Sequence, residues 1–173
     1  MRQKIYLLFF FVLISAAIFN YGAVPASERA ALIALYNSTD GDHWWINRGW
    51  KTPPLAADGF AMPGTEKNWA GVIVSGDTVT GISLYDNYVN GIIPPELGNL
   101  SNLQSLNFSG NSLSGTIPPE LGNLSNLQKL ILSINSLSGS IPPELGNLSN
   151  LQTLGIRENE LTGKSTRISV RRR

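Results

Sequence analysis

Few residues of this chain have the types needed for acid–base, nucleophilic or metal chemistry. The 173 residues include no cysteine and one histidine, His43. The lack of cysteine excludes a thiolate nucleophile, a thiolate metal site and a disulfide framework, and a single histidine excludes a histidine-rich zinc site. No serine stands at a recognisable nucleophile spacing from His43, although the members of a catalytic triad meet in space rather than in sequence.

Two short motifs resemble ligand sites, and both lack required residues. Residues 163–166, Gly-Lys-Ser-Thr, match the end of a phosphate-binding loop, but the full motif needs a glycine where Glu158 stands. Asp40 and Asp42 flank a glycine, yet the segment lacks the other oxygen ligands of a calcium loop. We therefore expect a solvated turn at residues 40–42, and no cofactor or metal site.

Three glutamates recur at a constant spacing, at Glu96, Glu120 and Glu144. A catalytic carboxylate pair needs two carboxyl groups in unlike environments, whereas these three share one sequence context, as a solvated edge would. Since no enzyme signature remains, the sequence predicts a non-catalytic protein.

The glutamates belong to a repeated segment, Ile-Pro-Pro-Glu-Leu-Gly-Asn-Leu-Ser-Asn-Leu-Gln, that begins at Ile93, Ile117 and Ile141 with a period of 24 residues. A fixed period of this length indicates a solenoid of stacked units. Each unit contains the pattern Leu-x-x-Leu-x-Leu-x-x-Asn-x-Leu, and a degenerate copy starts at Val79. We therefore expect about four repeats in residues 79–163.

The spacing within each unit predicts its local structure. The apolar-x-apolar pair alternates like a short strand, so the strands of successive units would form a parallel ladder. The Pro-Pro pairs block a regular helix and leave extended or 3₁₀ backbone on the outer side. The asparagine of each unit can bond backbone groups that the turn leaves unpaired. These asparagines would form an internal structural ladder: Asn87, Asn111, Asn135 and Asn159.

The array from Leu100 to Leu148 resembles the plant-type leucine-rich repeat, whose signature continues after the asparagine as Leu-x-Gly-x-Ile-Pro-x-x-Leu-Gly. That family includes plant receptor ectodomains and secreted polygalacturonase inhibitors, and similar arrays occur in secreted proteins outside plants. The resemblance implies an α/β solenoid, a short curved leucine-rich-repeat stack with a concave parallel β-sheet and a helical N-terminal cap. Members often use the concave face to bind peptides, proteins or glycans.

Residues 24–78 are predicted to form the cap, because the apolar end of a repeat stack has to be covered. Ser27 predicts the N-cap of a helix, and Leu32, Leu35 and Tyr36 share one face of that helix. The chain's four tryptophans all lie in this region, and we interpret them as a plug of the cap core, with a ligand site as the alternative. They are Trp44, Trp45, Trp50 and Trp69.

The cap departs from the family in one respect. Plant members usually close it with a cysteine pair around a Trp-x-Gly-Val-like motif, whereas this chain has Trp69-Ala70-Gly71-Val72 and no cysteine. We therefore expect apolar packing alone to hold this cysteine-free cap.

The chain starts with a basic segment followed by an apolar run over residues 5–19. A run of this length falls short of the roughly 20 residues that span a bilayer, so residues 1–23 are predicted to be a secretory signal peptide, with an uncleaved anchor as the alternative. The expected location is secreted or at the cell surface, with no membrane span in the mature chain.

The net charge of +1 hides two regions of opposite sign. Residues 164–173 form a basic tail with five basic residues and no acid, whereas residues 5–163 have six basic residues against 12 acidic ones, a formal charge of about −6. A net charge near zero argues against a nucleic-acid partner held by bulk charge, and binding of an acidic surface by the basic tail is kept as an alternative.

Positions at which the repeats differ are candidates for ligand recognition. The pair Tyr85 and Tyr88 beside Asp86 suits a polar or sugar-bearing ligand, and outward isoleucines stand where a solvated face would be polar. A face without a ligand, or one that contacts a second copy, is the alternative, and no oligomeric state is predicted. The candidates are Tyr85, Asp86, Tyr88, Asn107, Lys129, Ile131, Ile134, Arg157 and Glu158.

Five Asn-x-Ser/Thr triplets are possible N-glycosylation sites if the source is eukaryotic, and repeat consensus otherwise. They begin at Asn37, Asn99, Asn107, Asn123 and Asn147. Together these observations predict a non-catalytic extracellular recognition module that binds a protein, peptide or glycan on the concave repeat face. The alternatives are a fragment of a larger cell-surface receptor or adhesin, and the targeting module of a polysaccharide-active enzyme.

Overall fold

The computed structural model describes residues 22–162. Almost all of the predicted signal peptide, the basic tail and the Gly-Lys-Ser-Thr motif lie outside the described residues. The cap contains helix α2 (Ala26–Ser38), the 3₁₀ turns η1 (Gly41–His43) and η2 (Glu66–Asn68), and strand β1 (Val72–Ser75). The strands of the repeats are β2 (Thr78–Ser83), β3 (Asn90–Ile92), β4 (Ser105–Asn107), β5 (Ser112–Ser114), β6 (Lys129–Ile131), β7 (Ser138–Ser140), β8 (Thr153–Gly155) and β9 (Glu160–Thr162).

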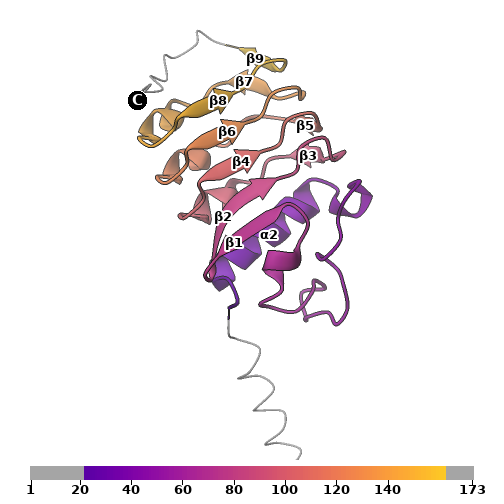
Figure 1. The fold of residues 1–173 in the computed structure, drawn as a ribbon. Coiled ribbons are helices and arrows are strands. Elements are labelled where there is room, and N and C mark those ends of the chain that lie inside the picture. Colours follow the sequence, from indigo (N-terminus) through magenta and orange to yellow (C-terminus); the bar gives the residue numbers. More distant parts are fainter. Residues whose placement is uncertain (1–21, 163–173) are drawn as a thin grey trace, which may run out of the picture.

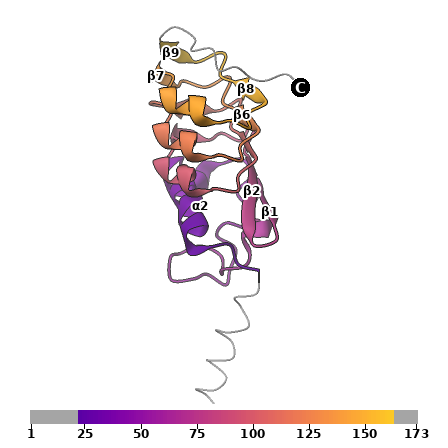
Figure 2. The same cartoon turned by 90° about the vertical axis from the view of Figure 1, so that its left-hand side faces the viewer.

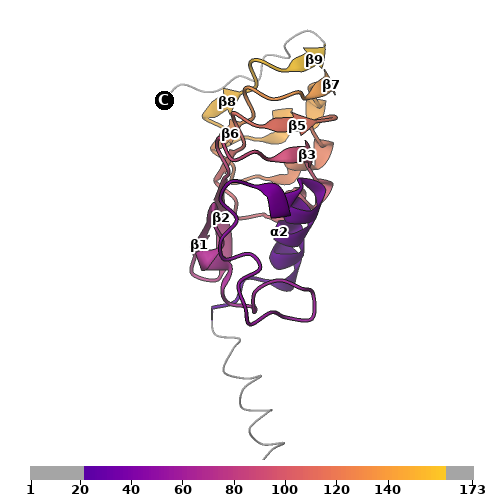
Figure 3. The ribbon, with the colours of Figure 1, turned by 90° about the vertical axis from the view of Figure 1, so that its right-hand side faces the viewer.

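The main sheet has the order β1-β2-β4-β6-β8 (Figure 1). β1 is antiparallel to β2, and the other strands are parallel and pair residues 24 positions apart, such as Leu106 with Leu130. On the opposite side of the stack lie the turns η3 (Pro95–Asn99), η4 (Pro119–Asn123) and η5 (Pro143–Asn147), with α2 below them (Figure 2). The pairs β3-β5 and β7-β9 connect the two sides (Figure 3). The predicted solenoid with a parallel sheet and a helical cap is confirmed.

The inner layer of the repeats is a column of leucines between the sheet and the 3₁₀ turns. Leu106 and Leu130 of the strands and Leu97 and Leu121 of the turns are fully buried, and each such side chain stabilises the fold by about 1.5–3 kcal/mol. Glycines in the turns let successive units approach closely. A Cβ added at Gly122 would lie 2.5 Å from the carbonyl oxygen of the next unit's glutamate.

The asparagines form a hydrogen-bonded ladder between successive turns. The amide of Asn111 donates to the carbonyls of Leu84 (2.7 Å) and Phe108 (2.9 Å), and its oxygen accepts the N–H groups of Asn87 and Val89, both at 3.0 Å. Asn135 and Asn159 likewise donate to one carbonyl of the preceding unit and one of their own, and each accepts one N–H of the preceding unit, from Leu113 and Leu137 respectively. Each asparagine therefore closes its own turn and fixes the register of the unit before it.

The helix of the cap begins differently from the prediction. Ser27 is not the N-cap: the helix starts at Ala26 after Pro25, and no side chain caps it. Proline supplies an extended residue at this position and has no N–H of its own to satisfy. The carboxylate of Glu28 in the first turn instead accepts the N–H of Val79 at 2.6 Å, which fastens the helix to β2, and burial raises the pKa of Glu28.

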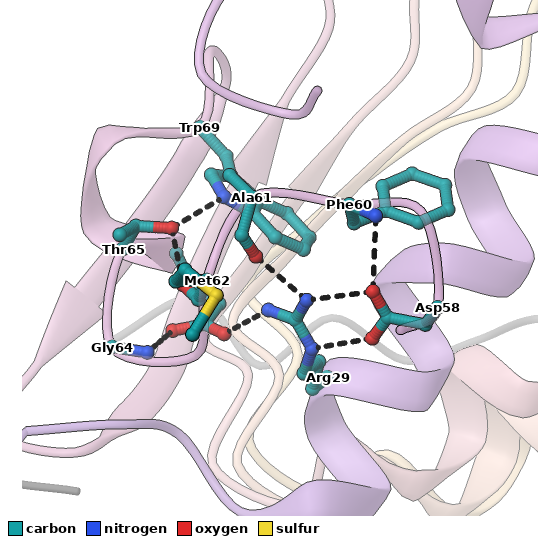
Figure 4. Close-up of polar contacts among 9 residues, drawn as sticks. Arg29, Asp58, Phe60, Ala61, Met62, Gly64, Thr65 and Trp69 are labelled. Carbon is teal, nitrogen blue, oxygen red and sulfur yellow. Dashed lines mark hydrogen bonds and ion pairs between the residues drawn. The ribbon is translucent and has the colours of Figure 1, made fainter. Parts of the chain in front are cut away.

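The expectation that apolar packing alone holds the cap was wrong. The buried guanidinium of Arg29 on α2 donates to Asp58 (3.0 and 3.1 Å), to Glu66 (2.5 Å) and to the carbonyl of Ala61 (2.7 Å), as Figure 4 shows. It also lies 5.0 Å from the ring centroid of Trp69. A buried ion cluster thus joins the helix to the loop that contains Asp58 and Glu66. These partners are 29 and 37 positions from Arg29, so no local sequence pattern predicts the contacts.

We expect Gly122→Ala to reduce the free energy of unfolding by about 1–3 kcal/mol, because the added methyl group collides with a backbone oxygen of the next unit. Gly146 occupies the same position in the last described turn and has nothing within 4 Å of an added Cβ. Gly146→Ala is therefore the matched control and should not reduce stability. Urea denaturation of both variants tests this, and equal losses would contradict the account of close stacking.

Arg29→Met should cost about 3 kcal/mol of stability, since it leaves the buried carboxylate of Glu66 without its charge partner. Lys51→Met provides the control, because Lys51 also lies over aromatic rings but pairs with the exposed carboxylate of Asp42. An exposed pair contributes below about 1 kcal/mol. Denaturation midpoints of the two variants that fall by the same amount would argue against a special role for the buried cluster.

The ion cluster also predicts a pH dependence. Hydrogen bonds from Arg29 hold the pKa of Asp58 below its usual value of 3.8, so the ionised carboxylate stabilises the fold at neutral pH, and this stabilisation is lost as the pH falls through its folded-state pKa. The stability difference between the wild type and Asp58→Asn should therefore be largest near neutral pH and shrink in acid. Urea titrations across that range measure it, and a difference independent of pH would refute the assignment.

Candidate ligand-binding surface

The outward side chains of the sheet form two rows that run along the solenoid axis. One row has Gly81, Ser105, Lys129 and Thr153, and the other has Ser83, Asn107, Ile131 and Gly155. The register holds neighbours in a row about 4.8 Å apart. Most members are small, so the two large side chains of β6 stand out among the repeat strands. On the edge strand β1, Ile73 pairs with Gly81 and lies over it, 55% exposed.

Ile131 and Asn107 each contact a neighbour on this surface. Ile131 is half-buried, and its γ2 methyl lies 3.2 Å from the position of a Cβ on Gly155, so it leans over the next strand. The side-chain oxygen of Asn107 accepts both the N–H (3.1 Å) and the hydroxyl (2.8 Å) of Ser109. This half-buried side chain contrasts with the other four sequon asparagines, which are exposed: Asn37, Asn99, Asn123 and Asn147.

The turns that follow the sheet strands form a rim beside the concave face. Tyr85 and Tyr88 are 61% and 60% exposed, and Ile134 is 51% exposed. The residue before each ladder asparagine has a left-handed backbone, with φ of 48° at Asp86, 70° at Gly110, 59° at Ile134 and 55° at Glu158. The fold therefore needs this conformation in every unit, although only one unit supplies a glycine for it.

Trp45 belongs to the rim and not to the cap core. The other three tryptophans pack with Tyr36 and Phe60, and the ring centroids of Trp50 and Trp69 are 4.6 Å apart. Trp45 is 68% exposed, and its ring centroid lies 5.4 Å from that of Tyr88 at an interplanar angle of 44°. The plug interpretation was therefore wrong for this residue.

A sequence signal for Trp45 was present in the adjacent pair Trp44-Trp45. Consecutive residues on extended backbone point to opposite sides, and Trp44 is extended, with φ of −61° and ψ of 143°. One ring of such a pair is buried and the other faces solvent. The contacts that place Trp45 beside the first repeat are visible only in the folded structure. The N–H of Trp45 donates to the carbonyl of Asn87 (3.1 Å), and Ile46 exchanges hydrogen bonds with the Asn87 side chain (2.7 and 3.1 Å).

The structure thus places the nine predicted site residues in three groups. Tyr85, Asp86, Tyr88 and Ile134 lie on the rim together with Trp45. Asn107, Lys129 and Ile131 lie on the sheet. Arg157 and Glu158 lie in the last described unit, where both are exposed.

The acidic turn of the cap, residues 40–43, is exposed at its ionisable side chains. His43 Nδ1 lies 2.7 Å from a carboxylate oxygen of Asp40, which raises the pKa of the imidazole. Asp42 accepts the Tyr36 hydroxyl (2.9 Å) and Lys51 (2.8 Å), and these bonds lower the pKa of its carboxyl. Residues 22–162 contain no group of three or more acidic or histidine side chains arranged to hold a metal ion. No helix in this same part of the chain is both long enough and apolar enough to cross a bilayer.

Comparisons with known proteins agree with this geometry. The sequence profile of the Leucine Rich Repeat family matches residues 102–124 and 126–148. No curated protein sequence matched the chain. Among solved structures, that of PEPR1–AtPEP1 is 32% identical with a TM-score of 0.66, and the match covers 80% of this chain and 19% of that chain.

Two Arabidopsis thaliana ectodomains are also similar. The receptor kinase GASSHO1/SCHENGEN3 in complex with CASPARIAN STRIP INTEGRITY FACTOR 2 is 33% identical with a TM-score of 0.56, over 65% of this chain and 14% of that chain. The BIR2 ectodomain is 25% identical with a TM-score of 0.54, over 82% of this chain and 84% of that chain. This chain therefore spans less than a fifth of the first two proteins and most of the third. The chain is therefore a plant-type leucine-rich repeat protein with a cysteine-free cap, as its repeats, its sheet register and these similarities indicate.

Proposed function

We propose that this chain is a non-catalytic extracellular recognition module that binds a peptide or protein on the concave sheet. The observation that carries this proposal is the contrast between the two faces of one strand set. Inward positions repeat as Ile82, Leu106, Leu130 and Leu154, whereas the outward rows change from unit to unit. Packing explains the repetition, but it does not explain the outward differences.

The large side chains of β6 are the centre of the proposed site. Lys129 is exposed and Ile131 half-buried, so the pair presents an ammonium group two residues from an apolar surface. A rigid sheet holds both without loss of backbone freedom on binding, which lowers the entropic cost of association.

The similar structures support a polypeptide ligand. One of them is the structure of PEPR1–AtPEP1, and another is GASSHO1/SCHENGEN3 in complex with CASPARIAN STRIP INTEGRITY FACTOR 2. The extracellular location rests on the predicted signal peptide of residues 1–23. A glycan ligand is the alternative that the experiment below addresses, and a role as part of a larger receptor, adhesin or polysaccharide-active enzyme is a second alternative.

Panning random dodecapeptides displayed on phage against the immobilised full chain tests the proposal. Selected peptides should lose about tenfold or more in affinity for Ile131→Ser, because the centre of the proposed site then lacks its apolar side chain. The control is Ile92→Ser, which removes an equally large isoleucine, 53% exposed, on β3, away from the concave face. Failure to select any peptide, combined with binding on an oligosaccharide array, would replace the polypeptide ligand by a glycan.

A further inference from the structure

Four exposed apolar side chains form a stripe on the rim: Trp45, Tyr85, Tyr88 and Ile134, hereafter the rim stripe. Each is more than half exposed, and the four come from the cap and from two different repeats. Large apolar side chains that gather on the surface of a soluble domain mark an interaction site far more often than single ones do.

The rim stripe follows successive turns along the solenoid axis. Trp45 and Tyr88 contact each other with ring centroids 5.4 Å apart. The Tyr85 ring reaches over the next unit, where its edge lies 3.5 Å from the position of a Cβ on Gly110. Ile134 follows in the unit after that. Backbone hydrogen bonds join these turns in order, from Trp45 N to Asn87 O (3.1 Å), from Asp86 N to Ser109 O (3.0 Å) and from Asn111 N to Ile134 O (3.0 Å).

Two members of the rim stripe oppose the stability of the free protein. Ile134 is β-branched and has φ of 59°, and Tyr88 has φ of 57°; side chains other than glycine and asparagine are strained there. The equivalent of Ile134 in the preceding unit is Gly110, which has no such strain. Neither side chain is buried in the core, so core packing does not compensate for the strain. A partner that buries these side chains explains both the exposure and the choice of residue.

The charge around the rim stripe indicates the chemistry of that partner. Asp86 is exposed between Tyr85 and Tyr88, and the described residues have six basic against 12 acidic side chains. Trp and Tyr faces attract Lys and Arg, and the desolvated centres of protein interfaces are rich in these aromatic residues. A carboxylate beside two exposed rings therefore favours a cationic side chain flanked by apolar ones.

We propose that the rim stripe binds a polypeptide segment in which Lys or Arg adjoins apolar side chains. The cation lies against Trp45 and Tyr88 with Asp86 as its counter-ion, and the apolar residues lie on Tyr85 and Ile134. This inference deepens the proposed function, on which it rests, because the rim borders the concave sheet and one ligand can contact both.

The peptides selected by panning on the full chain provide the probe. They should be rich in Lys or Arg next to aliphatic or aromatic residues, and their affinity should fall as salt rises. Trp45→Ser and Asp86→Asn should each weaken their binding about tenfold, while Ile92→Ser leaves it unchanged.

Ile134→Gly separates recognition from folding. It relieves the left-handed strain, so the Tm should rise by roughly 3 °C, while the affinity for the selected peptides falls about fivefold. A damaged fold cannot give that combination. A lower Tm, or a higher Tm with unchanged affinity, would overturn the role given to Ile134.

Four other results would overturn the inference. If Ile131→Ser abolishes binding and the rim variants do not affect it, the concave site stands and the rim proposal fails. If the selected peptides are acidic, the partner chemistry is wrong. If sedimentation shows a dimer that Trp45→Ser dissociates, the rim stripe is a contact between copies. If no peptide is selected at all, the polypeptide-binding function itself fails, and the rim proposal that rests on it fails with it.

Discussion

The register of the whole molecule depends on hydrogen bonds that cross from one turn to the next. A solenoid turn leaves backbone N–H and carbonyl groups without partners, and buried groups of this kind destabilise a fold. Asn111 and its equivalents satisfy them and add side-chain hydrogen bonds to the backbone ladder that also joins successive units. The same constraint reaches the cap, because Ile46 bonds the side chain of Asn87 as if it were a preceding unit. That junction places Trp45 beside Tyr88, so the composition of the rim follows from the way the stack is closed.

The cap shows how a domain without cysteine can still fix distant segments. A disulfide closes a loop covalently, whereas Arg29 closes it with charge-assisted hydrogen bonds to Asp58, Glu66 and a backbone carbonyl. Burial makes such a cluster costly unless every group has a partner. In the part of the chain that the structure describes, no buried side-chain nitrogen or oxygen lacks one. The cluster therefore holds the loop in one conformation, next to the aromatic core of the cap.

Local features of the structure could be predicted from sequence, and long-range ones could not. The strands, the 3₁₀ turns and the asparagine positions follow from a 24-residue period and from side-chain types within a few residues of one another. Other contacts join segments that belong to no common repeat, so the 24-residue period does not predict them. They are the pairing of Arg29 with Glu66, the pairing of β1 with β2 and the hydrogen bond between Glu28 and Val79. The same distinction applies to the candidate site. Positions on each repeat could be named from the sequence, but the place of Trp45 on the rim depends on how the cap folds against the first repeat.

Stability and recognition conflict at the rim, and the conflict indicates which surface residues matter. Every unit needs a left-handed residue before its ladder asparagine, and Gly110 meets that need without strain. The unit with Ile134 has a strained β-branched residue at this position instead, and its large apolar side chain is exposed. Outward differences on the sheet, such as Ser105 against Lys129, distinguish the units in the same way but carry no comparable cost in stability. The strained and exposed rim residues are therefore stronger evidence for a partner than the sheet residues, although both surfaces belong to the same edge of the stack.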